Sequence, residues 1–197
     1  CTERLLASFA PSATPAQCVL LRVLGVVSTP KALAAVQAQV GAQDPTLRDT
    51  AIRVLADWAE PAALPALLEV QRTATDETHR FLTLRGCVRL LDASPQPAGE
   101  KVKTYSDLLA RTQRTDDRKV LLSGLANVAD PAALKLVEPV LADELVRAEA
   151  ELAALKIAES LAKSAPAEAK AAASKLQAES KSENVRNRAS KLLEGLK

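Results

Sequence analysis

The sequence predicts an all-α fold in which a two-helix unit repeats along the chain, and three observations support this. Apolar residues recur at intervals of three and four, as in Leu47, Ala51 and Val54, which is the period of an amphipathic helix. Hydrophobic residues make up 48% of the 197 residues but aromatic residues only 2%, so side chains that favour strands are sparse. The segment 44–70 returns in part elsewhere, and such recurrence is typical of a solenoid.

Two markers define the repeat. The first is an arginine near the start of a second helix, found at Arg48, Arg80, Arg118, Arg147 and Arg186. An aspartate stands four residues earlier in three cases, at Asp44, Asp76 and Asp143, and we expect these polar pairs to form a ladder that ties neighbouring repeats together. The second marker is a proline that opens a helix, as in Thr29-Pro30, Glu60-Pro61 and Asp130-Pro131, where the preceding Thr or Asp can cap the new helix.

These markers predict about six antiparallel helix pairs joined by short links. The first helices are expected at 2–10, 31–42, 62–73, 99–113, 132–142 and 166–179. The second helices are expected at 16–28, 46–59, 78–92, 117–129, 145–163 and 184–196. Residues 1–197 are therefore predicted to form a single repeat domain, a fragment of a larger protein that is monomeric as a fragment.

The segment 44–70 resembles a HEAT repeat of the bacterial type. It carries the features of that family in order: Asp44-Pro45, Leu47-Arg48, Ala51, Glu60-Pro61 and the run Ala-Leu-Pro-Ala-Leu-Leu at 63–68. The resemblance implies a right-handed α-solenoid of the HEAT-like or armadillo type, a superhelix whose second helices line the concave side. It also implies a role in protein–protein scaffolding.

The charge and hydropathy of the chain exclude several classes of partner. The formal net charge is +2 and the isoelectric point about 8.5, which is too balanced for nucleic-acid binding by bulk electrostatics. No apolar stretch approaches the roughly 20 residues of a membrane span, so no transmembrane segment is expected. The chain has no methionine, so Cys1 is not expected to be a native start. The sequence leaves the location unknown: a bacterial cytoplasm is one candidate, and an extracytoplasmic location is the other if Cys1 is a processed lipoprotein terminus.

Candidate binding residues lie on the outward face of the second helices. If Val54 and Leu55 point inward, Arg53 points outward, and the equivalent positions give a partly basic stripe of Arg22, Arg53, Arg85, Arg89 and Asn127. Such a stripe fits an acidic peptide, a phosphate group or a nucleic-acid backbone, while the alternative is an ordinary solvated face. Asp49, Asp57 and Leu152 interrupt it, so phosphate tracking is poorly supported and we take these five residues as partner-binding candidates.

No catalytic, cofactor-binding or metal-ligating constellation is evident. The single histidine, His79, is expected to be solvated or to take part in capping; the six glycines are scattered, and the three cysteines lack metal-type spacing. The sequence thus favours a non-enzymatic interaction or scaffold module without cofactors, whose partner is a protein or an adjacent domain of the same polypeptide. Two alternatives stay open: a spacer that docks neighbouring domains, and a HEAT-like DNA glycosylase or bilin lyase. A glycosylase would need a basic groove with aromatic side chains to hold a displaced base.

Overall fold

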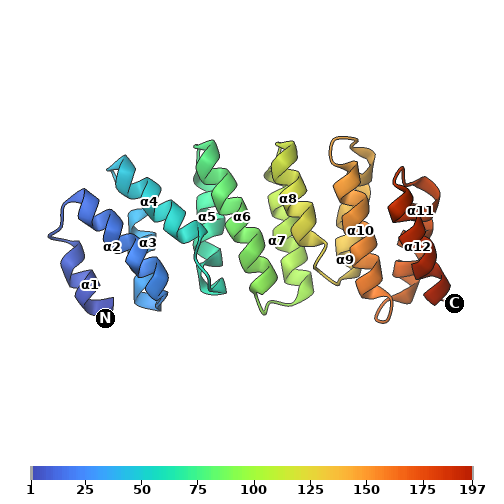
Figure 1. The fold of residues 1–197 in the computed structure, drawn as a ribbon, viewed down its shortest axis with the longest axis horizontal. Coiled ribbons are helices and arrows are strands. Elements are labelled where there is room, and N and C mark those ends of the chain that lie inside the picture. Colours follow the sequence, from blue (N-terminus) through green and yellow to red (C-terminus); the bar gives the residue numbers. More distant parts are fainter. Residues whose placement is uncertain (1, 197) are drawn as a thin grey trace. The chain divides into compact units, whose positions relative to one another are not determined.

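The structure, a computed structural model, describes residues 2–196. Within this range the chain forms twelve α-helices and two short 3₁₀ segments, with no strand (Figure 1). The prediction of an all-α fold is confirmed, and each of the twelve expected helices has a counterpart. Cys1, on which the lipoprotein hypothesis depends, lies outside the described residues. None of the described helices combines the length and apolar character that crossing a bilayer requires.

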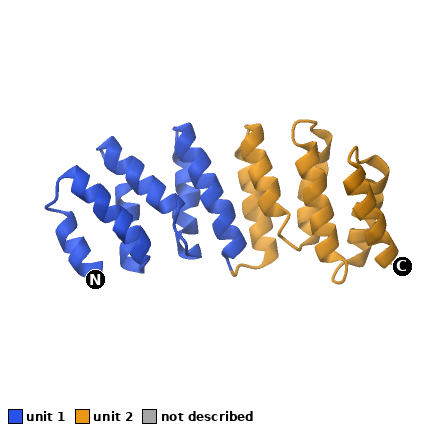
Figure 2. Cartoon of the chain, in the orientation of Figure 1, with its two compact units in different colours: residues 1–94 blue, residues 95–197 orange. Residues whose placement is uncertain are grey.

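The chain forms two compact units, residues 1–94 and 95–197 (Figure 2). One repeat domain over residues 1–197 stays a prediction. We call the helices at the predicted second positions the second helices: α2, α4 and α6 in unit 1, and α8, α10 and α12 in unit 2.

Unit 1 buries leucines between successive helices. Its elements are α1 (Thr2–Phe9), α2 (Thr14–Val27), α3 (Pro30–Gln39), α4 (Pro45–Ala56), η1 (Pro61–Ala63), α5 (Leu64–Thr73) and α6 (Glu77–Ala93). Each helix contacts its neighbour in the chain, and the second helices also contact one another, α2 with α4 and α4 with α6. Leu21, Leu55 and Leu84, one from each second helix, are fully buried at these contacts.

Unit 2 repeats this arrangement. Its elements are α7 (Ala98–Arg111), α8 (Thr115–Leu125), α9 (Pro131–Val137), η2 (Glu138–Ala142), α10 (Arg147–Leu161), α11 (Pro166–Glu179) and α12 (Glu183–Gly195). The pairs α7–α8, α9–α10 and α11–α12 are in contact, and α10 also contacts the second helices α8 and α12. Leu121, Leu155 and Ala189 are buried on these second helices.

Polar side chains begin many of these helices. Thr29, Asp44, Asp76, Asp130 and Ser182 each accept a hydrogen bond from a backbone N–H in the first turn of the helix that follows. Prolines follow three of these caps directly, because the first turn needs no N–H from them. The capping predicted at Thr29 and Asp130 is confirmed.

Four predicted helices end three or more residues earlier than expected. The helix expected at 31–42 ends at Gln39, and the helix expected at 117–129 ends at Leu125. The helix expected at 132–142 changes to 3₁₀ geometry at Glu138, because Pro139 cannot donate to the i−4 carbonyl and its ring clashes there. The helix expected at 46–59 ends at Ala56, since Asp57 leaves the helical conformation (φ −90°, ψ 1°). Trp58 is nevertheless buried in the core of unit 1.

Candidate interaction face of the second helices

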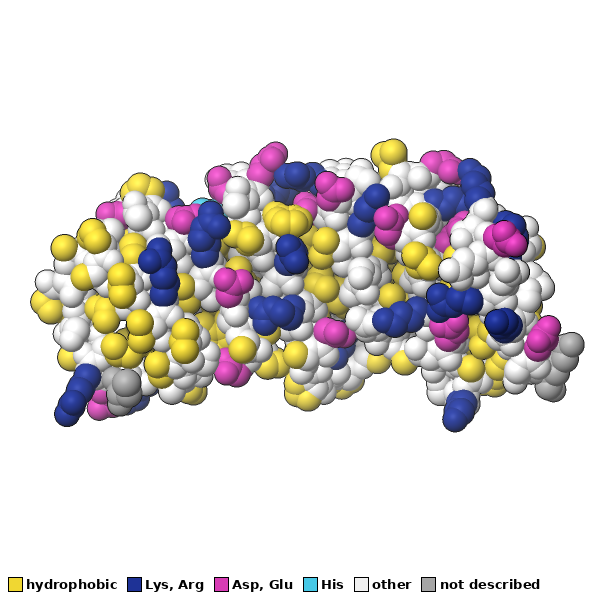
Figure 3. Space-filling view, in the orientation of Figure 1, with side chains coloured by type: hydrophobic (Ala, Val, Ile, Leu, Met, Phe, Trp, Pro, Cys, Tyr) yellow, Lys and Arg dark blue, Asp and Glu magenta, His cyan; other side chains and the backbone are white. Residues whose placement is uncertain are grey.

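The five candidate residues are all exposed. Arg22 lies on α2, Arg53 on α4, and Arg85 and Arg89 on α6, while Asn127 follows the end of α8 in unit 2. In unit 1 the second helices are toward the viewer in Figure 1, and Figure 3 shows the same side with its side chains. Basic and acidic side chains are mixed on this face of unit 1, among exposed hydrophobic ones.

Arg22 and Arg53 meet at a cavity between α2 and α4, which we call the α2–α4 groove. Its volume is about 540 Å³, and its lining comes from both helices: Arg22, Gly25, Val26, Asp49, Thr50, Arg53, Val54 and Asp57. The two helices approach closely beneath it, because a Cβ on Gly25 would lie 2.7 Å from Cγ1 of Val54. Gly25 therefore permits the close packing that positions the charged side chains above it.

Asp49 and Arg53, which line the groove, form a polar cluster with His79 of α6. Nε of Arg53 donates to Oδ2 of Asp49 over 2.8 Å, and Nε2 of His79 lies 2.9 Å from Oδ1 of the same carboxylate. The Arg53 guanidinium lowers the pKa of the Asp49 carboxyl, and the contact with His79 acts in the same direction, whereas Asp49 raises the pKa of Arg53. His79 takes part in capping, as one of its two expected roles, because its backbone N–H donates over 2.9 Å to the Asp76 cap of α6. Its side chain is 15% exposed and also joins α6 to α4, which the sequence did not predict.

Arg22, in contrast, makes no hydrogen bond or ion pair with any described residue. The negative charge of Asp49, its neighbour in the groove, is already shared by Arg53 and His79. Arg22 is thus the groove cation whose charge is available to a ligand.

The two candidates on α6 serve the fold of unit 1. Nη2 of Arg89 donates over 2.8 Å to the carbonyl oxygen of Ala56 at the C-terminal end of α4, where a cation is favoured by the helix dipole. The guanidinium of Arg85 lies 5.6 Å from the ring centroid of Phe81, one turn earlier on the same helix. Neither side chain lines the α2–α4 groove.

In unit 2, polar pairs cross between second helices at a regular spacing. Nζ of Lys156 donates to Oδ1 of Asn127 over 2.5 Å, and Nζ of Lys119 lies 3.2 Å from Oε1 of Glu149, so both pairs join α8 to α10. Arg188 on α12 donates to both carboxylate oxygens of Glu159 on α10. Asn127 is therefore one member of a row of helix-to-helix contacts.

Sequence reasoning missed an apolar patch on α2. Val19, Val23 and Val26 are 54%, 39% and 86% exposed, beside Arg22. The signal was present in the sequence: α2 is apolar around most of its circumference, and Arg22 is its only charged residue. Only one side of a helix can face the core, so such a helix must leave apolar side chains in solvent.

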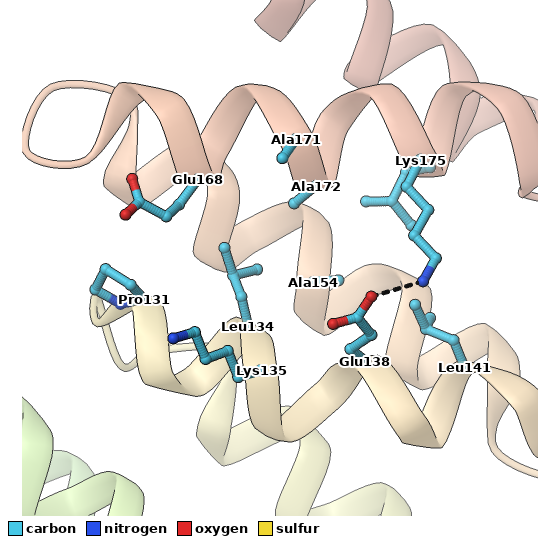
Figure 4. Close-up of a pocket in the computed structure, with 11 residues that line it drawn as sticks. Pro131, Leu134, Lys135, Glu138, Leu141, Ala154, Glu168, Ala171, Ala172 and Lys175 are labelled. Carbon is cyan, nitrogen blue, oxygen red and sulfur yellow. Dashed lines mark hydrogen bonds and ion pairs between the residues drawn. The ribbon is translucent and has the colours of Figure 1, made fainter.

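A second groove lies in unit 2, between α9–η2 and α11 (Figure 4). Its volume is about 360 Å³, and Leu134, Ala154 and Leu176 are among its apolar lining residues. Figure 4 shows Lys175 and Glu138 facing each other across it, with Nζ and Oε1 2.8 Å apart. None of the five candidate residues lines this groove.

Comparisons with known proteins do not assign this chain to a family. Neither a scan against protein-family models nor a search of curated proteins found a match to this chain. Over residues 2–196, no three His, Cys, Asp or Glu side chains are grouped so that they could hold a metal ion.

Proposed function

We propose that the chain is a right-handed HEAT-like solenoid of about six antiparallel helix pairs, and that it binds a partner protein through its second helices without catalysing a reaction. The succession of contacts α2–α4–α6 and α8–α10–α12 supports a repeated stack within each unit. Two repeat arginines also make the same contact: Arg48 donates to the carbonyl of Ala42 and Arg186 to that of Ser180, each six residues earlier. Equivalent contacts at equivalent positions are what a structural repeat produces.

The α2–α4 groove is the observation that best supports the proposed binding function. It brings two of the five candidate residues to one exposed cavity, and its volume falls in the range of ligand sites, about 300–1,000 Å³. The available cation at Arg22 gives an acidic side chain of a partner a specific place to bind. The partner is a separate protein or an adjacent domain of the same polypeptide.

A pull-down from a lysate of the source organism tests this function. The chain is the bait, beside an Arg22→Glu/Arg53→Glu variant that reverses both groove cations. The matched control, Lys31→Glu/Arg72→Glu, changes two exposed cations on α3 and α5 that pair with Glu3 and Glu69, away from the groove. Circular dichroism confirms that each variant folds.

We expect one protein to be captured by the parent chain and the control and to be lost from the groove variant. Capture that survives the groove variant, or no captured protein in any lane, would contradict the proposal. Arg89 is left unchanged because its contact with Ala56 gives it a structural role.

A further inference from the structure

The exposed face of α2 is a short apolar strip with one charge midway along its length, at the edge that borders the α2–α4 groove. Val19, Arg22, Val23 and Val26 fall within an arc of about 100° and extend over about 10 Å of the helix, at 100° and 1.5 Å per residue. Exposed apolar side chains scattered singly need no explanation, but a contiguous set marks an interaction surface. The strip borders the α2–α4 groove, because Arg22 and Val26 line both.

Among the residues that the structure describes, the charge within this strip has no ion-pair partner. α2 contains no acidic residue, and Arg22 forms no ion pair with any residue from 2 to 196. A partner that covers the valines would also bury Arg22, and burying an unpaired charge is costly. The partner must therefore supply a carboxylate midway along the contact, at the edge of its own apolar face.

We infer that the strip binds an amphipathic α-helix of a partner protein, whose aliphatic residues lie one turn on either side of a central Asp or Glu. This inference rests on the proposed function and names the chemistry of the partner. The side-chain rows of one helix fit the grooves of another, and the α2–α4 groove offers such a channel beside the strip. The valines cover the aliphatic residues, and Arg22 pairs with the carboxylate.

A membrane surface fits the strip less well. Helices that lie in a bilayer interface carry several Lys or Arg on the polar face and bulky Trp, Phe or Leu on the other. α2 has a single cation and small β-branched side chains at its exposed positions. The charge and the side-chain size both favour a protein helix.

A displayed library of monomeric helical hairpins, randomised on one exposed helix face, tests this inference by selection against the whole chain. We expect enriched clones to carry Asp or Glu flanked by Leu, Ile or Val at the neighbouring turns. Their affinity should fall at least tenfold on Val26→Glu, which changes the most exposed valine and so leaves the fold intact. The control, Leu145→Glu, makes the same kind of change at an exposed leucine in unit 2 and should leave the affinity unchanged.

Charge reversal then tests the central contact. Arg22→Glu should weaken the enriched clones at least tenfold, and replacing their central acid with Arg should restore binding to that variant. No enriched clone, clones without the acid, or binding that persists in Val26→Glu and Arg22→Glu would each overturn the inference. So would binding of the parent chain, but not of Val26→Glu, to vesicles of phosphatidylcholine and phosphatidylglycerol in the absence of enriched clones.

The two proposals fail separately. A partner captured from the lysate through Arg22 and Arg53, together with a failed library selection, would leave the binding function standing and remove the helix. Loss of both results would remove both.

Discussion

The repeat arginines occur at corresponding positions near the start of the second helices, but their hydrogen-bond partners differ. Arg48 and Arg186 donate to a carbonyl six residues earlier, whereas Arg118 reaches forward to pair with Asp143 near the start of the next second helix. Arg147 pairs with Glu144 and Glu151, and its Nη2 also donates over 2.8 Å to the backbone carbonyl of Glu179 at the end of α11. Contacts between repeats are therefore found at Arg118 and Arg147 and not at Arg48, because a long side chain takes whichever acceptor the local backbone presents.

A substitution at Gly86 tests how closely α6 packs against α4. A Cβ at this position would lie 2.7 Å from the carbonyl oxygen of Ala56, a backbone atom that also accepts from Arg89 and so is held in place. We expect Gly86→Ala to lower the free energy of unfolding by about 1–3 kcal/mol, as overpacking does. Urea denaturation measures it beside Gly41→Ala, where a Cβ meets nothing within 4 Å. Equal stability of the two variants would show that the helices can separate freely.

A substitution at Glu151 tests how much one buried carboxylate contributes to the stability of unit 2. It accepts from Nε of Arg147 over 2.9 Å and from Oγ of Ser180 over 2.5 Å, and so joins α10 to the segment between α11 and α12. Glu151→Ala leaves both donors without this acceptor, and we expect a loss of about 1–3 kcal/mol in the free energy of unfolding. Glu168→Ala, at an exposed carboxylate of α11, serves as the control in the same denaturation experiment. A loss as small as that of the control would mean that water replaces the carboxylate.

At the scale of helices, local chemistry explains why the sequence predicted the elements well. Proline after a capping residue and the three-and-four apolar period both act within a few residues, so they can be read without knowing the fold. Failures occur where a second signal competes, as at Pro139, which converts the end of a predicted helix into η2. The exposed valines of α2 show another limit: the pattern of this helix is apolar, but it does not say which side meets the core.

Substitutions at Asp130 test how much one helix cap contributes to the free energy of unfolding. Its Oδ1 accepts from the backbone N–H of Ala132 over 2.8 Å at the start of α9. We expect Asp130→Ala to reduce the free energy of unfolding by about 1 kcal/mol, and Asp130→Asn to retain most of it because asparagine is an equally good cap. Asp107→Ala, an exposed aspartate within α7, should change it little. If the alanine and asparagine variants at 130 are equally stable, the cap does not contribute.

At the scale of the whole molecule, polar contacts between second helices follow the repeat length. Asp49–His79 in unit 1 and Lys119–Glu149, Asn127–Lys156 and Glu159–Arg188 in unit 2 each join residues 29 or 30 apart. The sequence predicted exposure at Asn127 but not its pairing, because pairing depends on how far one repeat is rotated against the next. Four of the five candidate residues thus make internal contacts. Arg22 makes none with the described residues, and it lies beside the exposed valines of α2.

These contacts also determine how stability depends on pH. Carboxyls whose pKa is lowered in the folded protein occur in both units. Hydrogen bonds from the Leu47 backbone and Thr14 lower the pKa of Asp44, Arg53 lowers that of Asp49, and Arg118 lowers that of Asp143. A lowered folded-state pKa means that the unfolded chain binds protons first as the pH falls. The stabilisation is complete well above the unfolded pKa, near 3.8 for Asp, and is lost as the pH falls through the lower folded values.

We therefore expect the thermal unfolding midpoint to be nearly constant from pH 7 to pH 5 and to fall steeply between pH 4 and pH 2, at constant ionic strength. Asp44→Asn/Asp143→Asn removes two of the titrating groups, so its midpoint should be lower than that of the parent at pH 7 and should fall less on acidification. The difference between the two proteins should shrink toward pH 2, because a protonated aspartate is neutral and nearly isosteric with asparagine. A constant difference across the range would mean that these carboxyls keep their ordinary pKa values in the folded protein and that their contacts contribute nothing through charge.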